Sequence, residues 1–316
     1  MEKTLKILVA RFSSIGDIVL CSPIVRCLKE QLSSEVHFIT KDKYKDIIET
    51  NPYIDKVYSI QNSTSEVFKS LKKENYDYLI DLHKNIRTFQ LIKFATNYLS
   101  YNKQNFMKFL FIKFGINLIN DKHIVDRYFE SIRNLRVKND GKGLDFFLDD
   151  CDIVDLNCFD SNYITFAIGG THFTKILPID KIIEICNIQD KQLVLIGGKE
   201  DYKRGEIIRS QCKNVINECG KHTIKQSAYI VKNSNFLITH DTGMMHIASA
   251  FGIKIISVFG GTHPKLGFAP YLPNSENKII QIENLKCRPC HRFGRSKCPK
   301  GHFKCMKNID VSLFAE

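Results

Sequence analysis

Apolar residues along this chain fall into short runs that alternate with stretches of helical spacing. The clearest unit spans residues 236–261, where apolar runs at 235–239 and 253–259 flank a helical pattern at 244–251. Apolar runs of about five to seven residues around a helix of about eight predict a strand, a helix and a strand. Such a unit is parallel, so its first loop, HDTG at 240–243, lies at the carboxyl end of a strand.

A similar series of elements starts at the N-terminus. Residues 6–12 (KILVARF) form a nearly continuous apolar run, which is typical of a strand buried on both faces. The pattern then predicts helices and strands in alternation: helices at 18–32, 44–49 and 67–73, and strands at 35–40, 56–60 and 76–82. This alternation predicts an α/β domain with a doubly wound parallel sheet.

The second half of the chain has the same layout. Predicted strands at 163–168 and 192–196 alternate with predicted helices at 179–188, 203–212 and 223–232. Between the halves, residues 139–162 are rich in Asp, Asn and Gly, which indicates a boundary. Because 316 residues suit two domains of about 150 each, we expect Rossmann-like domains at 1–155 and 156–316.

Residues 82–120 depart from this regular pattern. They hold eight aromatic and six basic residues and no Asp or Glu. Basic amphipathic helices with aromatic faces are typical of contact with a membrane surface or an anionic amphiphile. The alternative is that the aromatic side chains pack on the sheet while the lysines are solvated. The sequence leaves both interpretations open, and a further helix is expected at 125–135.

Composition places the chain among ordinary globular proteins, with 43% hydrophobic and 25% charged residues. No apolar run approaches the roughly 20 residues that span a bilayer, and the N-terminus lacks a signal-peptide pattern, so a cytoplasmic location is expected. The net charge of +12 indicates an acidic partner: nucleic acid, anionic lipid or a phosphorylated ligand. Eleven cysteines in a reducing compartment are expected to be core thiols or metal ligands.

The HDTG loop is a candidate anion site. It leads into a helix N-terminus, whose unpaired N–H groups and dipole favour an anion such as a diphosphate. Asp241, Thr242, Gly243 and His246 are therefore candidate site residues. The alternative is structural: Asp241 or Thr242 caps the helix, and Gly243 relieves a tight turn.

Two further loops follow predicted strands. SSIGD at 13–17 places Gly16 where the backbone can approach a ligand, and Asp17 either caps the next helix or accepts a proton from an incoming hydroxyl. The loop lacks the G-x-G-x-x-G spacing of a dinucleotide fold, which counts against NAD or FAD. In the second half, GGT at 169–171, with Thr174 and Lys175, offers hydroxyls and a cation suited to phosphate.

The C-terminal segment 286–307 is rich in cysteine and carries eight Lys and Arg residues with no acids. Its four cysteines follow the pattern C-x₂-C-x₇-C-x₆-C: Cys287, Cys290, Cys298 and Cys305. The first pair has the spacing of a structural zinc site, with His291 and His302 as alternative ligands. The second pair does not, so reduced thiols packed against the domain are the alternative.

Taken together, these motifs resemble glycosyltransferase family 9, the ADP-heptose:lipopolysaccharide heptosyltransferase family. The resemblance rests on KILVARFSSIGDIVLCSPIVRCLKEQL, NPYIDKVYSI, DLHKNIRT and ITHDTGMMHIASAFG followed by SVFGGTHP. It implies the GT-B architecture, with two Rossmann-like doubly wound domains facing across a cleft. It further implies an inverting, metal-independent enzyme that holds its acceptor on the N-terminal domain and its nucleotide sugar on the C-terminal one.

Carried onto this sequence, the resemblance makes Asp17 the general base. It assigns donor binding to residues of the second half: Thr171, Thr174, Lys175, Asp241, Thr242, Gly243, Met244 and His246. Acceptor binding falls to residues of the first half: Ser14, Gly16, His83, Lys84 and Arg87. One position departs from the family pattern, because Lys225 beside Gln226 stands where some members place a glutamate that holds the ribose.

The expected activity is transfer of heptose, or a related sugar, from an ADP-sugar to a lipopolysaccharide core or lipid A precursor. No cofactor is expected to be required for catalysis. The expected partners are the ADP-sugar, a lipid-linked or phosphorylated oligosaccharide, and the inner face of the membrane through peripheral contact, without nucleic acid. Two alternatives are a nucleotide-sugar-binding protein without transfer activity and a basic nucleic-acid-binding protein with a zinc-ribbon tail.

Overall fold

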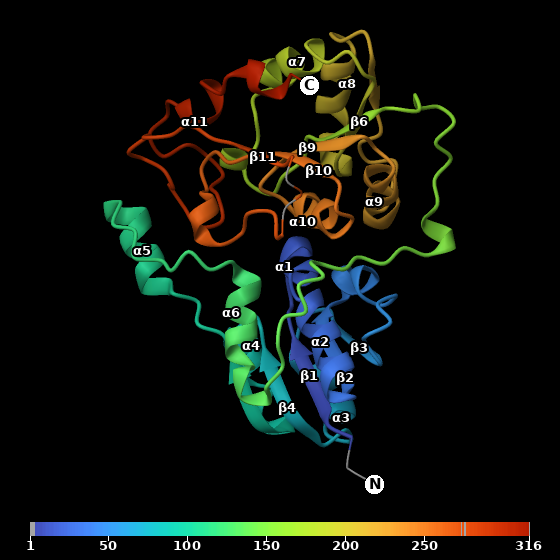
Figure 1. Ribbon diagram of the computed structural model, residues 1–316, viewed down its shortest axis with the longest axis vertical. Helices are drawn as coiled ribbons and strands as arrows, with labels where there is room; N and C mark the ends of the chain where they lie inside the picture. Colours follow the sequence, from blue (N-terminus) through green and yellow to red (C-terminus); the bar gives the residue numbers. More distant parts are fainter. Residues whose placement is uncertain (1–3, 273, 275, 316) are drawn as a thin grey trace. The chain divides into compact units, whose positions relative to one another are not determined.

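In a computed structural model, the chain divides into two compact units that are interleaved in sequence (Figure 1). The structure describes residues 4–272, 274 and 276–315. The first unit comprises Met1–Lys103 and Lys122–Asp149, and the second comprises Gln104–Asp121 and Asp150–Glu316. None of the helices among the described residues is long and apolar enough to cross a membrane.

The first unit is built on a parallel sheet of five strands in the order β3-β2-β1-β4-β5. Its strands are β1 (Lys6–Ala10), β2 (Glu35–Lys41), β3 (Lys56–Ile60), β4 (Tyr76–Asp81) and β5 (Ala95–Ser100). Its α-helices are α1 (Ile15–Val19), α2 (Ser22–Leu32), α3 (Phe68–Leu71), α4 (Ile86–Phe89) and α6 (Ile124–Ser131). Strand β1 lies in the middle of the sheet and is buried over most of its length, as its continuous apolar run predicts.

The second unit is built on a parallel sheet of six strands in the order β11-β10-β9-β6-β7-β8. Its strands are β6 (Ile164–Ala167), β7 (Leu193–Ile196), β8 (Val215–Asn217), β9 (Phe236–His240), β10 (Lys254–Val258) and β11 (Lys278–Ile280). Its α-helices are α5 (Asn105–Phe114), α7 (Ile179–Asn187), α8 (Tyr202–Arg209), α9 (Ile224–Lys232), α10 (Gly243–Ala250) and α11 (Lys304–Lys307). Helices α7 and α8 pack on one face of the sheet, and α9 and α10 on the other (Figure 1).

The predicted class, an α/β chain with two Rossmann-like parallel sheets, is confirmed. The main local differences concern edge strands, since β5, β8 and β11 were not predicted. The helix expected at 18–32 is interrupted at Leu20 and Cys21 and forms α1 and α2. The helix expected at 44–49 is a 3₁₀ turn, Asp42–Ile47.

The division of the chain also differs from the expected boundary after residue 155. The contacts divide it after Asp149, and they place the segment 104–121 with the second unit. The reason for the second difference is a small apolar cluster in which Phe111 and Ile119 pack against Leu266, with Phe268 beside it. Tertiary packing therefore assigns this segment, although it interrupts the first unit in sequence.

Each unit has its own hydrophobic core. In the second unit the core includes the end of the chain, where Phe303, Met306 and Phe314 are buried. The basic cysteine-rich tail is therefore an integral part of this unit. Burial of these apolar side chains offsets the ordering of a segment that has little regular structure.

A buried arginine on α2 holds the segment 139–162, which the sequence indicates as a domain boundary, in place. Arg26 on α2 is 1% exposed, and its guanidinium holds both oxygens of Asp140 at 2.8 and 2.9 Å. It also donates to the Gly143 carbonyl at 2.9 Å and pairs with Asp145. The bonds from Arg26 lower the pKa of Asp140 to about 2. The polar segment is thus ordered by one cation that lies on the preceding helix.

We expect Arg26→Met to reduce the free energy of unfolding by about 3 kcal/mol at neutral pH, because it leaves partly buried carboxylates unpaired. The depressed pKa of Asp140 contributes stability that is present above about pH 4 and is lost as the pH falls through about 2. The difference between variant and wild type should therefore shrink on acidification, as measured by urea unfolding. Lys29→Met, which removes an exposed pair with Asp55, is the control and should cost less than about 1 kcal/mol.

Candidate active site

In the first unit, the order of the strands reverses between β1 and β4. The chain proceeds from β1 outward through β2 to β3, and β4 then lies on the other side of β1. Loops that follow two strands flanking such a reversal diverge and leave room for a ligand at the carboxyl edge. Here these are the loops at 13–17 and 82–87, so the topology brings two of the sequence-predicted segments to one edge.

Asp17 lies in the first turn of α1, and three donors surround its carboxylate. The Ser14 backbone N–H and hydroxyl donate to Oδ2 at 3.0 and 2.9 Å. The Arg11 guanidinium pairs with Oδ1 at 2.6 Å. The N-cap of α1 is Ser14 rather than Asp17, and Asp17 lies at the third helical position, where it completes a capping box with Ser14. A carboxylate offers about four acceptor positions, so one remains for a further donor.

Arg11 keeps Asp17 ionised. Burial acts to raise the pKa of Asp17, but the Arg11 charge and the Ser14 bonds outweigh it and lower the pKa below its usual range. Arg11 itself is buried at the end of β1, where its side chain also donates to the Ser13 carbonyl at 2.7 Å and to the Tyr128 hydroxyl at 3.2 Å. The pair is therefore a fixed ionic feature of this edge, with the Asp17 side chain 18% exposed.

The loop after β4 supplies the remaining residues expected to bind the acceptor. Asp81 accepts hydrogen bonds from the backbone N–H groups of His83 and Lys84, which shape the turn. Burial and the Arg11 charge lower the pKa of His83 to about 3, so its imidazole is neutral at physiological pH. Lys84 donates to the Tyr101 carbonyl at 3.3 Å, and Arg87 is half-buried on α4. The side chains of Asp17, His83 and Arg87 therefore belong to adjoining loops.

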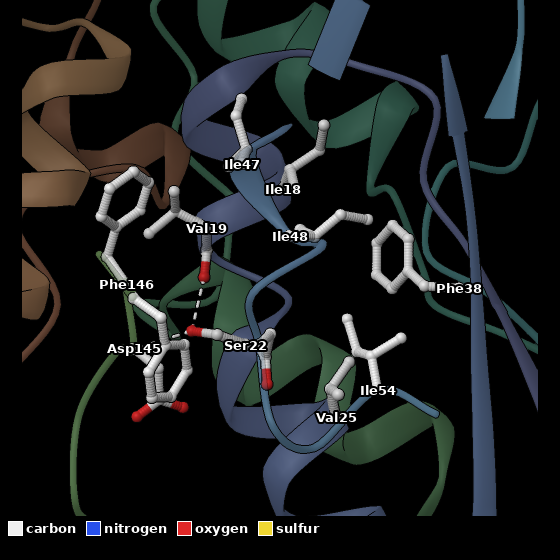
Figure 2. A pocket seen from close by; sticks show the side chains of 12 residues that line it. Ile18, Val19, Ser22, Val25, Phe38, Ile47, Ile48, Ile54, Asp145 and Phe146 are labelled. Carbon is white, nitrogen blue, oxygen red and sulfur yellow. Dashed lines mark hydrogen bonds between the residues drawn. The ribbon is translucent and has the colours of Figure 1, made fainter. Parts of the chain in front are cut away.

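A separate pocket in the first unit is lined mainly by apolar side chains (Figure 2). Ile18, Val25 and Phe38 line it together with Ile48, and the Ser22 hydroxyl donates to the Val19 carbonyl at 2.7 Å. None of the site residues predicted from the sequence lines this pocket. Its lining offers little polar chemistry, so we regard it as a packing feature between α2, β2 and the segment 145–147.

The second unit repeats the topological arrangement. Its strand order reverses between β6 and β9, which are adjacent in the sheet. The loops at this point are those at 168–175 and 241–243, which contain the glycines, hydroxyls, lysine and aspartate singled out in the sequence. The fold therefore brings together two segments that are distant along the chain.

Lys175 and Asp241 form an ion pair at this edge. Lys175 Nζ lies 2.9 Å from Asp241 Oδ2, and the Thr262 hydroxyl donates to the same oxygen at 2.7 Å. A carboxylate repels a diphosphate, so Asp241 is better placed to position Lys175 than to contact phosphate itself. The buried His240 accepts a hydrogen bond from the Leu177 backbone N–H at 3.0 Å and so ties the loop that carries Lys175 to β9.

The N-terminus of α10 is not capped by a side chain. Thr242 occupies the N-cap position, but its side chain makes no capping hydrogen bond and lies 3.2 Å from the Thr239 hydroxyl instead. The carboxylate of Asp241 is engaged by Lys175 and Thr262. The structural alternative, that one of these residues caps the helix, therefore does not hold. Thr242 therefore leaves the N-terminus of α10 without a side-chain cap, and such a terminus favours an anion.

The other predicted donor residues differ in exposure. Thr171 is exposed, and Gly243 is half-buried at the start of α10. Met244 and His246 are buried on α10, at 8% and 4% exposed. Thr174 is also buried, and its hydroxyl accepts a hydrogen bond from the Arg295 backbone N–H at 2.7 Å. Thr174 thus acts first as a support for the loop that carries Lys175.

The C-terminal tail packs directly on this loop. A Cβ added at Gly294 would lie 2.7 Å from His172 Cβ and 3.0 Å from Lys175 Cγ. Arg295 exchanges hydrogen bonds with Thr174, and the Cys290 N–H donates to the Gly261 carbonyl at 3.0 Å. The tail therefore forms one wall around Lys175, which its sequence position alone does not indicate.

The four tail cysteines line a common pocket together with His302. Cys287 Sγ lies 3.8 Å from His302 Nε2. The four sulfur atoms are not gathered as closely as a bound ion requires, since the described groups with three ligand atoms within 4.8 Å of one another do not include them. Arg288 fastens this segment to the loop after β10 by donating to the carbonyls of Phe259 at 2.9 Å and Gly260 at 2.6 Å.

Lys225, the position that departs from the family pattern, has a structural partner. Its Nζ lies 3.2 Å from Asp152 Oδ2, and both side chains are almost fully buried. The neighbouring Gln226 completes a capping box with Thr223 at the start of α9. These contacts account for both residues within the fold.

Sequence reasoning missed several residues that shape these loops: Arg11, His240, Thr262, Gly294 and Arg295. A signal existed for Arg11, because a charged residue within a buried apolar run requires a partner. Gly294 and Arg295 gave no signal, because their effect depends on contact with a loop more than a hundred residues earlier in the chain.

The chain matches the model of glycosyltransferase family 9 (heptosyltransferase) over residues 64–299. Lipopolysaccharide heptosyltransferase 1 of Campylobacter coli is 24% identical over 327 aligned residues, which cover 89% of this chain and 92% of that protein. Lipooligosaccharide heptosyltransferase 2 of Campylobacter jejuni is 34% identical over 104 residues, covering 33% of this chain and 31% of that protein.

Solved structures show the same fold. A glycosyltransferase family 9 protein from Veillonella parvula superposes with a TM-score of 0.76 at 19% identity, covering 99% of this chain and 96% of that one. The E. coli heptosyltransferase WaaC, solved with ADP, superposes with a TM-score of 0.68 at 17% identity, covering 87% of this chain and 92% of that one. These neighbours share the pair of Rossmann-like parallel sheets described above.

We expect Gly294→Ala to weaken binding of a nucleoside diphosphate about tenfold, because the added methyl group displaces the stem of Lys175. Gly294 also has a φ of +96°, so the substitution strains the backbone. Gly301→Ala is the matched control: it lies in the same tail at a φ of +72° and has nothing within 4 Å of the added Cβ. Calorimetric titration with ADP should separate the two variants, and equal affinities would contradict this role of the tail.

Proposed function

The chain belongs to glycosyltransferase family 9, the heptosyltransferase family, and on that premise we propose that it transfers heptose, or a related sugar, from an ADP-sugar to a lipopolysaccharide core or lipid A precursor. The main observation that supports the proposed binding of the donor is the uncapped N-terminus of α10 beside Lys175. That arrangement suits a diphosphate, and WaaC, a structural neighbour, was solved with ADP.

In the proposed donor complex, the diphosphate lies against the N–H groups of Thr242 and Gly243. Its negative charge attracts Lys175, which pairs with Asp241, and Asp241 in turn accepts a hydrogen bond from the Thr262 hydroxyl. Charge builds on the diphosphate as the glycosidic bond breaks, so a lysine and a helix N-terminus beside it stabilise the transition state more than the ground state. On this proposal no cation is needed to neutralise the leaving group.

The proposed acceptor half is the edge that carries Asp17. Ser14, Gly16, His83, Lys84 and Arg87 belong to the two loops at this edge and would supply hydrogen-bonding and cationic groups for a phosphorylated saccharide. The Asp17 carboxylate takes the proton of the acceptor hydroxyl while the hydroxyl oxygen attacks the anomeric carbon. The ADP departs from the opposite face in the same displacement, so the configuration at that carbon is inverted.

We propose that the reaction takes place in the cytoplasm, where nucleotide sugars are made. The ribose contact is assigned to residues other than Lys225, whose charge is already matched by Asp152. The donor base and the sugar are therefore best determined by direct competition among nucleotide sugars.

The proposal predicts that Asp17→Ala lowers the rate of sugar transfer by about a hundredfold or more, because a positioned base contributes factors of that order. Binding of the ADP-sugar, measured as the rise in melting temperature, should stay close to that of the wild type. Lys175→Ala should instead weaken nucleotide binding, which would be seen as a much smaller rise in melting temperature on adding ADP. Asp17→Asn, which keeps the size of the side chain but removes its charge, separates the loss of the carboxylate from the loss of side-chain volume.

Two results would count against this assignment. If no nucleotide sugar raises the melting temperature of the wild type, the donor site is wrong. If Asp17→Asn transfers sugar at the wild-type rate, Asp17 is a structural residue of the capping box and the base lies elsewhere.

We further propose that the four tail cysteines hold a structural zinc ion. The supporting observation is that Cys287, Cys290, Cys298 and Cys305 line one pocket in a segment with little regular structure. Burial raises the pKa of Cys305 to about 11, so its thiol is protonated at neutral pH unless a metal displaces the proton. Binding of the ion would draw the sulfur atoms closer together, and catalysis does not use it.

If the tail holds zinc, protein purified without added metal should contain about one zinc ion per chain when measured by elemental mass spectrometry. Cys298→Ser should abolish the bound zinc and lower the melting temperature, whereas Cys212→Ser, at a partly exposed thiol outside the tail, should change neither. Wild-type protein that contains no metal and is insensitive to chelators would instead indicate reduced thiols packed against the domain.

A further inference from the structure

The segment 104–121 exposes an unusual number of large apolar side chains. Phe106 is 72% exposed, Phe114 is 60% and Leu118 is 58%, and Phe109 and Ile116 are more than half exposed. Isolated exposed apolar residues are ordinary, but a group of five within one short segment indicates an interaction surface. Figure 1 shows this segment as α5 with its flanking loops.

One face of α5 is already occupied. Phe111 and Ile119 pack against Leu266, and the Phe111 ring meets the His263 ring at 5.4 Å between centroids. The ammonium group of Lys108 lies over the Phe268 ring, 5.3 Å from its centroid. These contacts fix the orientation of the helix on the second unit.

The opposite face of α5 therefore points away from its support. Residues at positions i, i+3 and i+7 share a helix face, which places Phe106, Phe109 and Lys113 together and away from Phe111. Phe114 meets Phe109 edge to face, with ring centroids 6.0 Å apart. We define the docking surface as Phe106, Phe109, Lys113, Phe114, Ile116 and Leu118.

The charge of the surroundings indicates the partner. Residues 82–120 contain no acid, and Lys113 lies between phenylalanines on the exposed face. Arg292 of the basic tail donates to the Asn105 side chain at 3.1 Å and stacks on Phe293, which is itself 49% exposed. Basic groups around exposed aromatic rings complement the anionic headgroups and the acyl region of a bilayer.

From this we infer that the docking surface binds the anionic surface of a lipid bilayer, with its phenylalanines entering the interface. Helix α5 has ten residues and is too short to cross a membrane, so it lies in the plane of the interface. A second copy of this chain is a poorer occupant, because two basic surfaces of the same sign repel each other. The surface gives a structural basis for peripheral membrane contact that does not depend on sugar transfer.

A tryptophan reporter tests this inference directly, because the chain has no tryptophan and thus no background tryptophan emission. Phe109→Trp should show a blue shift and protection from an aqueous quencher when vesicles of phosphatidylethanolamine and phosphatidylglycerol are added. Ile207→Trp, at an exposed position on α8, should show neither change. High salt should weaken the response, because the lysine and arginine contacts are screened.

Binding can also be measured without a reporter, by sedimentation with the same vesicles. The triple variant Phe106→Ser, Phe109→Ser, Phe114→Ser should partition at least about tenfold more weakly than the wild type. The matched control replaces three exposed apolar residues elsewhere, Ile153→Ser, Ile188→Ser and Ile207→Ser, and should bind as the wild type does.

Three outcomes would overturn the inference: wild-type protein that ignores phosphatidylglycerol vesicles, a triple variant that binds them equally well, or a triple variant that only changes the oligomeric state in light scattering. The vesicles contain neither nucleotide sugar nor saccharide acceptor. A protein that does not bind these vesicles could therefore still transfer sugar as proposed. Likewise, a protein that does not transfer sugar could still bind the vesicles.

Discussion

The two proposed binding edges, one in each unit, depend on the same topological constraint, the reversal of strand order within a parallel sheet. The reversal lies between β1 and β4 in the first unit and between β6 and β9 in the second. At each point two loops diverge at the carboxyl edge, and each pair carries one cationic and one carboxylate side chain in contact: Arg11 with Asp17, and Lys175 with Asp241. The fold thus creates both openings, and the ion pairs give each a defined charge.

The two ion pairs differ in which of the two charged side chains is free to contact a ligand. Arg11 is buried beneath Asp17, so the carboxylate is the group nearer to solvent. In the second unit Asp241 is held by Thr262, and the flexible lysine stem can move toward an anion. On the proposed function, the same pair of charges would therefore supply a base in one unit and a phosphate-binding cation in the other.

The sequence predicts the strands that are long, apolar and central, because continuous burial leaves a clear pattern in β1, β9 and β10. It does not predict β8 or β11, which are three-residue edge strands with too few side chains to show a period. The placement of the candidate loops at the carboxyl edges of the sheets could be predicted, since a glycine, a hydroxyl and a carboxylate follow a buried strand. Their partners could not, because Gly294 meets Lys175 only through tertiary packing.

Asp17 is subject to two opposing demands. The fold needs an ionised carboxylate to match the buried Arg11 and to accept the Ser14 N–H, and these contacts lower its pKa. A base of low pKa attracts a proton weakly, so it assists little while the acceptor oxygen is still a neutral hydroxyl. Its effect grows as that oxygen bonds to the anomeric carbon and becomes strongly acidic. On the proposed mechanism, proton transfer to Asp17 would therefore come late in the displacement, after most of the negative charge has moved onto the diphosphate that we propose lies beside Lys175.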